Sequence, residues 1–310
     1  MIATNVLQAI GNTPLVQLCH IVPRGSGRVF VKLEFANPTG SMKDRMAKAV
    51  VEAAETDGRL KPGGTVVEYT GGTTGVSLAF VCAAKGYKFH AVFSDAFSDE
   101  KRMMMNAFGG VVTDVPSENK QITEKLIRAM IEKARTLSQQ PDHWWCDQIN
   151  NRDAEKGYYA LGEEIWNQTG GKVDAFVKSV GSAHCLHGVT KALQAHNPRI
   201  HAVAVEPAES PVLTGGSPGG HQIEGIGIGF TPPLWEPKLV NEVVGVSTKD
   251  AQVMARRLAK EEALFAGTSS GANVVAALYV AARLGPGATV VTILVDSGLR
   301  YVSTGLYKTE

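Results

Sequence analysis

Three short loops rich in glycine and hydroxyl residues stand at expected strand–helix junctions. They are Thr70–Gly75, Gly181–Gly188 and Gly267–Gly271. Such a loop exposes unpaired backbone N–H groups at the positive end of a helix dipole, where phosphate or carboxylate binds. Taken singly, each loop could instead be a tight turn that needs small residues. Together they indicate one ligand with two anionic ends, or two anionic ligands, in a cleft between two halves of the chain.

A lysine with a distinctive setting follows the turn Asn37-Pro38-Thr39-Gly40. Lys43 stands just before an expected helix, at the edge of the expected cleft. Desolvation near a helix N-terminus disfavours the charged amine, so its pKa falls and it can attack a carbonyl. Taken alone, Lys43 could also be a solvated surface lysine. A lysine imine, a phosphate loop and a cleft together point to pyridoxal phosphate (PLP).

Other nucleotide and metal sites are not indicated. The chain has no G-x-x-x-x-G-K-[ST] motif, and Gly225–Gly229 lacks the last glycine of a dinucleotide fingerprint. Pro232 and Pro233 follow it, so no helix can open there. The four cysteines lie far apart and form no zinc-ligand pattern, so we expect no metal site and four reduced thiols.

Composition excludes several classes of protein. The 310 residues include 31 Lys+Arg against 30 Asp+Glu, which argues against a polybasic nucleic-acid binder. The start of the chain has no signal-peptide pattern, and no apolar run is long enough to span a bilayer. These features predict a cytoplasmic protein without membrane association.

Expected strands and helices alternate along the chain, which favours an α/β fold with parallel sheets. The expected strands are Val29–Leu33, Thr65–Tyr69, Phe89–Ser94, Val111–Val115, Val173–Val180, Ile200–Val205 and Thr289–Val295. The expected helices are Arg45–Thr56, Val76–Lys85, Glu100–Phe108, Asn119–Leu137, one ending at Ala195, Lys249–Glu262 and Asn273–Leu284. The polar segment Ser138–Arg152 is the best candidate boundary, and Ser210–Thr231 is a long, glycine-rich and therefore functional loop.

Seven segments resemble, in order, the cysteine synthase (O-acetylserine sulfhydrylase) family of PLP enzymes, which also holds cystathionine β-synthase. They are Ile10–Val16, Asn37–Arg45, Glu68–Gly75, Gly181–Cys185, Glu224–Phe230, Gly267–Gly271 and Asp296–Thr304. The resemblance implies the fold of type II PLP enzymes, with two domains that each hold a twisted, mostly parallel sheet flanked by helices, and the cofactor between them. It implies a smaller, mobile substrate-side domain (45–150) and a larger cofactor-phosphate domain (1–44 and 151–310).

The resemblance also implies roles for individual residues. Lys43 would hold the cofactor as an imine and act as the acid/base at the substrate α-carbon. Thr73 would meet the cofactor's phenolic oxygen and Ser269 its ring nitrogen. The phosphate would bind Gly181, Ser182, Ala183, His184 and Cys185. The amino-acid substrate would bind Thr70, Gly71, Gly72, Thr74, Gln148 and Gly225.

The reaction that the resemblance implies is β-replacement. An O-activated serine loses its leaving group to give an α-aminoacrylate, and sulfide or another small nucleophile adds. An alternative with the same cofactor is β-elimination, as in a serine/threonine dehydratase or a β-lyase, and a more distant one is a non-catalytic binding relative. The family also implies a homodimer.

Two loops depart from the family pattern. The usual Thr-Ser-Gly-Asn-Thr-Gly is here Thr70-Gly71-Gly72-Thr73-Thr74-Gly75. We therefore expect weak use of O-acetylserine and a preference for a different or larger partner, admitted by extra room at Gly71. In the phosphate loop, Ala183 and His184 replace glycines and restrict the backbone. We expect His184 to begin a helix and His187 to lie on the surface, with charge pairing to phosphate as the alternative.

Overall fold

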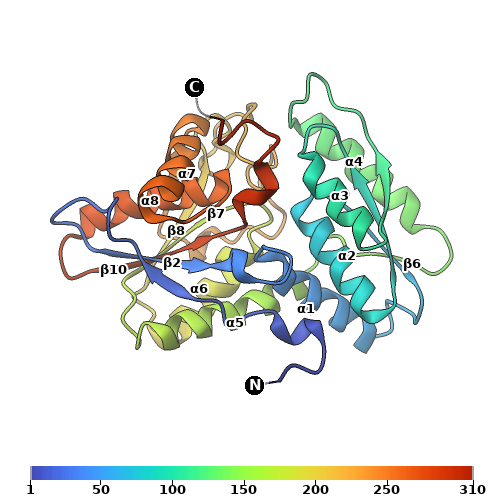
Figure 1. Ribbon diagram of the computed structural model, residues 1–310, viewed down its shortest axis with the longest axis horizontal. Coiled ribbons are helices and arrows are strands. Elements are labelled where there is room, and N and C mark those ends of the chain that lie inside the picture. Colours follow the sequence, from blue (N-terminus) through green and yellow to red (C-terminus); the bar gives the residue numbers. More distant parts are fainter. Residues whose placement is uncertain (1, 309–310) are drawn as a thin grey trace.

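The computed structural model describes residues 2–308 and contains two mainly parallel sheets that stand side by side (Figure 1). The larger sheet has the strand order β1-β2-β10-β7-β8-β9, and the smaller has the order β5-β4-β3-β6. Neighbouring strands are parallel except for β1 and β2. The α/β class predicted from the alternating pattern is confirmed.

Strands of the larger sheet come from both ends of the chain. They are β1 (Leu15–Gln17), β2 (Arg28–Leu33), β7 (Ala175–Ser179), β8 (His201–Pro207), β9 (Glu242–Val246) and β10 (Thr289–Leu294). The smaller sheet uses one continuous stretch of chain. Its strands are β3 (Thr65–Tyr69), β4 (Lys88–Phe93), β5 (Val111–Asp114) and β6 (His143–Trp145). Most strand residues are buried on both faces, as parallel sheets covered by helices require.

Helices cover both faces of each sheet. They are α1 (Lys43–Thr56), α2 (Thr73–Lys85), α3 (Asp99–Ala107), α4 (Glu124–Ser138), α5 (Asp153–Gln168), α6 (His184–His196), α7 (Thr248–Glu262) and α8 (Thr268–Leu284). In Figure 1, α7 and α8 lie above the larger sheet, and α5 and α6 lie below it. Short 3₁₀ turns complete the chain: Val6–Ala9, Glu34–Ala36, Val212–Thr214, Pro237–Leu239 and Gly298–Tyr301.

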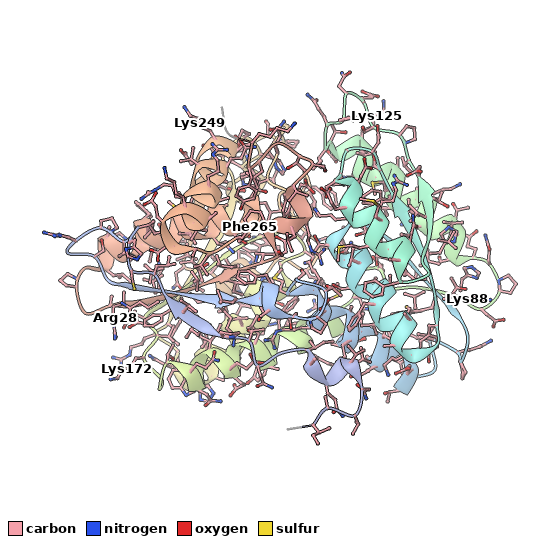
Figure 2. The ribbon with its side chains drawn as sticks, in the orientation of Figure 1. Arg28, Lys88, Lys125, Lys172, Lys249 and Phe265 are labelled. Carbon is pink, nitrogen blue, oxygen red and sulfur yellow. The ribbon has the colours of Figure 1, made fainter. Side chains whose placement is uncertain are left out.

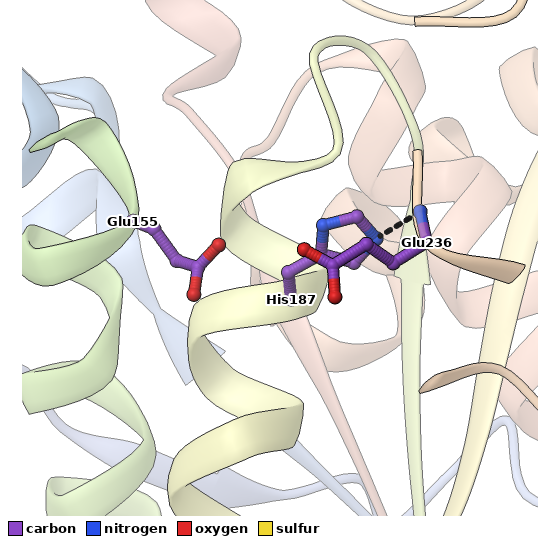
Figure 3. Close-up of side chains that lie close together, drawn as sticks. All are labelled: Glu155, His187 and Glu236. Atoms are coloured by element: carbon purple, nitrogen blue, oxygen red, sulfur yellow. Dashed lines mark hydrogen bonds between the residues drawn. The ribbon is translucent and has the colours of Figure 1, made fainter. Parts of the chain in front are cut away.

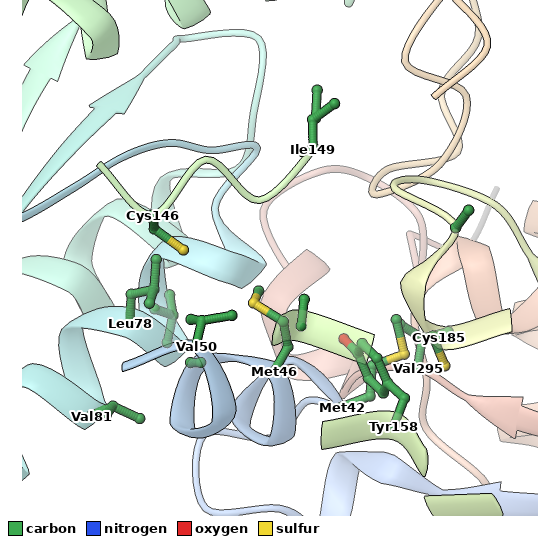
Figure 4. Packing of buried hydrophobic residues seen from close by; sticks show 14 of the residues in the cluster. Met42, Met46, Val50, Leu78, Val81, Cys146, Ile149, Tyr158, Cys185 and Val295 are labelled. Carbon is green, nitrogen blue, oxygen red and sulfur yellow. The ribbon is translucent and has the colours of Figure 1, made fainter. Parts of the chain in front are cut away.

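Helix α1 passes between the two sheets and joins their cores (Figure 1). Its buried residues Met46 and Val50 face Leu78 of α2 on the side of the smaller sheet (Figure 4). At its start, Met42 lies with Tyr158 of α5 in the same core (Figure 4). Each such side chain contributes about 1.5–3 kcal/mol by leaving water, so the start of α1 is held firmly.

Some predicted elements differ from the structure. The sequence missed β1, β6, β9 and α5, and the segment Ser138–Arg152 holds β6 as well as connecting chain. The helix expected from Asn119 begins only at Glu124, because Asn119 and Lys120 have positive φ angles and Thr123 caps the first turn. Helix α8 begins at Thr268, five residues before the predicted start at Asn273.

Charged side chains are spread around the surface. The labelled cations Arg28, Lys88, Lys125, Lys172 and Lys249 are exposed and point outward on different sides of the molecule (Figure 2). This distribution agrees with the near-zero net charge. None of the helices described has both the length and the apolar character needed to cross a membrane.

Candidate active site

A pocket between the two sheets collects most of the residues predicted for the site. It is lined by Lys43, Thr70, Gly71, Thr73, Thr74, Gln148, Gly181, Ser182 and Gly225, together with apolar side chains that include Phe97, Ile122 and Ile149. The remaining predicted residues, Gly72, Ala183, His184, Cys185 and Ser269, are not among the residues that line it. The loops after β3 and β7 contribute opposite walls, as expected for ligands at the carboxyl ends of parallel strands.

Lys43 is the first residue of α1, and its position is fixed by the chain before it. Ser41 forms an isolated β-bridge with Asp296, and the Met42 N–H donates to the Val295 carbonyl at 3.0 Å. Burial lowers the pKa of the Lys43 amine, against the opposing influence of Cys185 and Asp296. This is the direction that the sequence predicts, and it favours the uncharged, nucleophilic amine.

The loop after β3 is organised by the hydroxyl of Thr70. Its Oγ1 accepts hydrogen bonds from the N–H groups of Gly72 at 2.8 Å and Gly75 at 3.0 Å. Gly72 was predicted to bind the substrate, but its N–H already donates to Thr70 within the loop. Within residues 2–308, the N–H groups of Gly71, Thr73 and Thr74 have no acceptor. These three donors at the start of α2 form a site for a carboxylate.

Gln148 closes one side of this loop. Its Oε1 accepts from the Thr74 hydroxyl at 2.8 Å, and its Nε2 donates to the Tyr69 carbonyl at 2.9 Å. Its backbone N–H donates to Glu68 Oε2 at 2.9 Å. Glu68 is fully buried, which raises the pKa of its carboxyl to about 8. No role was predicted for Glu68, although it lies inside Glu68–Gly75, one of the segments that resemble the family.

The extra room expected beside Gly71 does not exist. A Cβ built on Gly71 would lie 3.0 Å from an edge carbon of the Phe97 ring. Phe97 therefore occupies the space that the missing serine side chain leaves. The sequence missed this residue because it lies between β4 and α3, far from Gly71 along the chain.

The loop after β7 forms a cradle of backbone donors. Within the described chain, the N–H groups of Gly181, Ser182, Ala183, His184 and Cys185 have no acceptor. Ala183 has φ +71°, a left-handed conformation that turns the backbone into the start of α6. A Cβ on Gly181 would lie 2.6 Å from the Gly225 carbonyl oxygen, so only glycine allows this close approach. A row of free N–H groups at a helix start fits a phosphate.

The two histidines of this region are both buried. His184 begins α6, as predicted, and its Nδ1 pairs with Ser182 Oγ at 2.9 Å. Burial lowers the pKa of the His184 imidazole to about 3, which favours the neutral ring. The prediction of a surface position for His187 is wrong, because His187 is fully buried and its ring stacks on Trp235.

His187 lies beside the carboxylates of Glu155 and Glu236 (Figure 3). Its Nε2 accepts from the Glu236 N–H at 3.4 Å, which leaves the proton of the neutral ring on Nδ1. Lys191 Nζ already contacts Glu155 at 2.8 Å and Glu236 at 3.2 Å. Arg152 Nη1 also lies 3.6 Å from Glu236 Oε1, so the two cations Lys191 and Arg152 balance the two carboxylates of this cluster, which joins α5, α6 and the Pro237–Leu239 turn.

Further residues of the site come from the C-terminal part of the chain. Ser269 is buried in the first turn of α8 and does not line the pocket. Asp296 Oδ2 accepts from the Tyr301 hydroxyl at 2.7 Å and from Thr73 Oγ1 at 3.4 Å. The Thr73 hydroxyl is thus directed toward Asp296, and Asp296 was not singled out from the sequence.

The residues present fit PLP. A nucleophilic lysine, a cradle of free N–H groups and a second set of free N–H groups face one pocket. His184 Nε2 and Asp296 Oδ1 are buried without partners within residues 2–308. His184 and Asp296 hydrogen-bond to Ser182 and Thr73, which line the pocket, and such unpaired polar atoms are expected where a polar ligand completes a site.

Comparisons with known proteins agree with this site. A family model described as "Pyridoxal-phosphate dependent enzyme" matches residues 6–296. A cysteine synthase of Staphylococcus aureus is 42% identical over 305 residues, which cover 98% of this chain and 96% of the relative. The crystal structure of a cysteine synthase from Entamoeba histolytica superposes with a TM-score of 0.92 and 37% identity, covering 100% of this chain and 92% of that one. The crystal structure of an O-ureido-L-serine synthase superposes with a TM-score of 0.92 and 35% identity, covering 99% of this chain and 96% of that one. The chain therefore belongs to the pyridoxal-phosphate dependent enzyme family, as a β-replacement enzyme similar to the cysteine synthases.

Proposed function

We propose that the chain replaces the β-substituent of an O-activated serine with sulfide or another small nucleophile. The observation that carries this proposal is the position of Lys43, with its lowered pKa, in one pocket with two sets of free N–H donors. One set suits the cofactor phosphate and the other suits the carboxylate of an amino acid. PLP, when bound, supplies an electron-withdrawing ring that stabilises negative charge at the substrate α-carbon.

Each residue then has a defined task. The N–H groups of 181–185 hold the phosphate, and Ser269 faces the ring nitrogen as a neutral partner. The N–H groups of Gly71, Thr73 and Thr74 hold the substrate carboxylate, while Gln148 fixes the Thr74 hydroxyl. The Lys43 amine takes the proton from the α-carbon, and the leaving group departs from the β-carbon with its bonding electrons. Lys43 returns the proton after the nucleophile has formed the new bond at the β-carbon.

We further propose that the unit around the smaller sheet, residues 45–150, moves against the rest of the chain when substrate binds. The support is that the two walls of the pocket come from the two sheets. We also propose a homodimer, since the similar enzymes of this family imply it, and a cytoplasmic location. The cysteines Cys19, Cys82, Cys146 and Cys185 are free thiols, which suits a reducing compartment. A mass in light scattering equal to one chain would reject the dimer.

The reaction is tested with purified holoenzyme, O-acetylserine and sulfide. We expect a new amino acid as product and little pyruvate, whereas pyruvate as the main product would indicate elimination. Lys43→Ala should abolish turnover. Lys48→Ala removes an amine from the same helix outside this pocket and should leave turnover unchanged.

Placement of the cofactor is tested separately by borohydride reduction of the holoenzyme and peptide mapping. We expect the label on Lys43. A label on any other lysine would show that the assignment of the cofactor lysine is wrong.

A further inference from the structure

Lys178 is a buried lysine that stands apart from the other buried lysines of this chain. Lys32 contacts Glu164 at 2.8 Å, and Lys101 contacts Glu224. Lys178 is only 1% exposed, yet in the described chain no carboxylate oxygen lies within 4.0 Å of its Nζ. A buried ammonium group without a counter-charge is costly, so its presence needs a reason.

The geometry places this amine at the carboxyl end of β7, close to the start of the loop 181–185. Lys178 is on β7, on the same face of the sheet as Phe176 and Val180, because side chains alternate along a strand. That face packs in one core with Cys185, in the first turn of α6. The Nζ donates to the carbonyl of Ser179 at 2.8 Å and to its Oγ at 2.9 Å, so it points toward the carboxyl end of β7.

This amine has one donor to spare. An ammonium group has three N–H bonds, and two of them are used by Ser179. The strand ends there, and the loop 181–185 with its unused backbone N–H groups begins two residues later. An anion in that loop would supply both the missing counter-charge and an acceptor on the same side of the sheet.

We propose that Lys178 is the buried cation that balances the phosphate of the cofactor from the carboxyl end of β7, close to the loop 181–185. The proposal rests on the placement of the phosphate given under the proposed function. In this arrangement, the backbone cradle supplies the hydrogen bonds to the phosphate and Lys178 supplies the positive charge. Lys178 is therefore a positioning residue and does not take part in proton transfer at the substrate.

The electrostatic surroundings of Lys178 agree with this role. Burial lowers its pKa to about 8, so it is poised to lose its proton at moderately alkaline pH in the absence of an anion. The titratable groups that act on it are Cys185 from α6, Lys43 from α1 and Asp296 after β10. Cys185 is held as a neutral thiol, since burial raises its pKa to about 11. A bound phosphate dianion would favour the protonated form of Lys178, and by linkage the protonated form would favour phosphate.

The test compares two ligands that differ only in the phosphate. Apoenzyme prepared from holoenzyme is titrated with PLP and with pyridoxal, and the ratio of the two affinities isolates the phosphate contribution from bond formation at Lys43. We expect Lys178→Met to lower this ratio about tenfold or more, in line with a lost charged hydrogen bond. In the native protein the ratio should fall as the pH rises above about 8, since Lys178 then loses its proton. In Lys178→Met the ratio should not show this fall.

Further variants show whether a change in this ratio is specific to Lys178. Lys191→Met removes a positive charge from α6 away from the loop and should leave the ratio unchanged. Ser182→Asp places a negative charge in the loop and should lower the ratio; if it does not, the phosphate placement itself is wrong. If Ser182→Asp lowers the ratio and Lys178→Met does not, the inference about Lys178 alone is overturned. If Lys178→Met does not fold, the inference is tested instead by the affinity ratio of Lys178→Gln and by the pH dependence of this ratio in the native protein.

Discussion

The side chain of Lys101 lies directly over the backbone of Gly72, so closely that a Cβ at position 72 would overlap its carbons. The amine continues across the site to Glu224, next to Gly225 of the pocket, and lies 4.6 Å from the centre of the Tyr301 ring. Lys101 belongs to α3, beside the smaller sheet, whereas Glu224 and Tyr301 belong to the part of the chain that builds the larger one. The Lys101 side chain thus links the unit around the smaller sheet to the rest of the chain, beside the loop Thr70–Gly75.

Gly72→Ala should be destabilising for two reasons. Gly72 has φ +108°, and the added methyl group would displace Lys101. We expect a loss of about 2–4 kcal/mol in the free energy of unfolding, measured by urea denaturation. Gly58→Ala is the matched control, because Gly58 has φ +79° and no atom within 4 Å of its built Cβ. Equal losses in the two variants would show that Lys101 does not constrain Gly72.

Lys101→Met should weaken the connection between the two units. It leaves the Glu224 carboxylate, whose side chain is 14% exposed, without its partner. We expect a loss of about 3 kcal/mol in stability and partial recovery in the double variant Lys101→Met/Glu224→Gln, since the unpaired charge is then removed. Lys125→Met breaks the exposed pair with Glu118 and should change stability by less than about 1 kcal/mol. An equally small effect at Lys101 would contradict the role given to this pair.

Ala183→Gly should stabilise the protein. Ala183 holds φ +71°, which costs an alanine about 1 kcal/mol and glycine almost nothing. Ala263, with φ +56° after α7, is a matched position away from the pocket. We expect both Ala→Gly variants to raise the midpoint of urea denaturation by similar amounts. A lower midpoint for Ala183→Gly alone would mean that its methyl group contributes packing that outweighs the backbone strain.

Glu68→Gln should change how stability depends on pH. The folded pKa of Glu68 is about 8, against an ordinary value of 4.5, so the native state keeps a proton that the unfolded chain releases between these values. The contribution of Glu68 to native stability therefore falls as pH rises from 4.5 to 8, by at most about 1.4 kcal/mol per pH unit for one proton. The variant lacks this contribution, so its stability relative to the native protein should increase over that range in urea titrations. Glu132→Gln, at an exposed carboxylate, is the control, and parallel curves for Glu68→Gln would refute the assignment.

Substrate preference should depend on Thr73 more than on Gly71. Thr73→Asn restores the family residue at the start of α2 and should raise kcat/KM for O-acetylserine with sulfide. Gly71→Ser must displace the Phe97 ring, so by itself it should lower stability and bring little gain. If the native protein already works as fast as Thr73→Asn, the departure at position 73 is neutral and the expected weak use of O-acetylserine is wrong.

The sequence predicted elements well where one local pattern determined them. The strand Thr65–Tyr69 was placed with its observed bounds, because a short apolar run stands between Gly64 and a loop of small residues. Helix α5 was missed, since Gly157 and Gly162 interrupt its pattern. The structure shows why they are there: a Cβ at Gly157 would lie 2.5 Å from the Arg45 carbonyl, and one at Gly162 would lie 2.5 Å from Ala192. Close packing of α5 against α1 and α6 requires them.

Features of the site that depend on distant contacts could not be predicted. Phe97 fills the space at Gly71 through packing between segments that are far apart in the chain. The left-handed backbone of Ala183 has no local signal either, because alanine ordinarily favours the right-handed helix. Lys43 and the loops Thr70–Gly75 and Gly181–Gly188 could be predicted, because the residues that identify each of them are adjacent in the sequence.

The position of β10 has a consequence for how the larger sheet is assembled. This strand, Thr289–Leu294, is inserted between β2 and β7, and the residues just after it hold the chain before Lys43 in place. Thr289 pairs with Arg28, so this contact closes a loop of 261 residues (289 − 28). Contacts between residues so far apart in the chain are slow to form, because the entropy of loop closure must be offset first. The larger sheet is therefore continuous, and Lys43 fixed in place, only after one of its most distant strand pairings has formed.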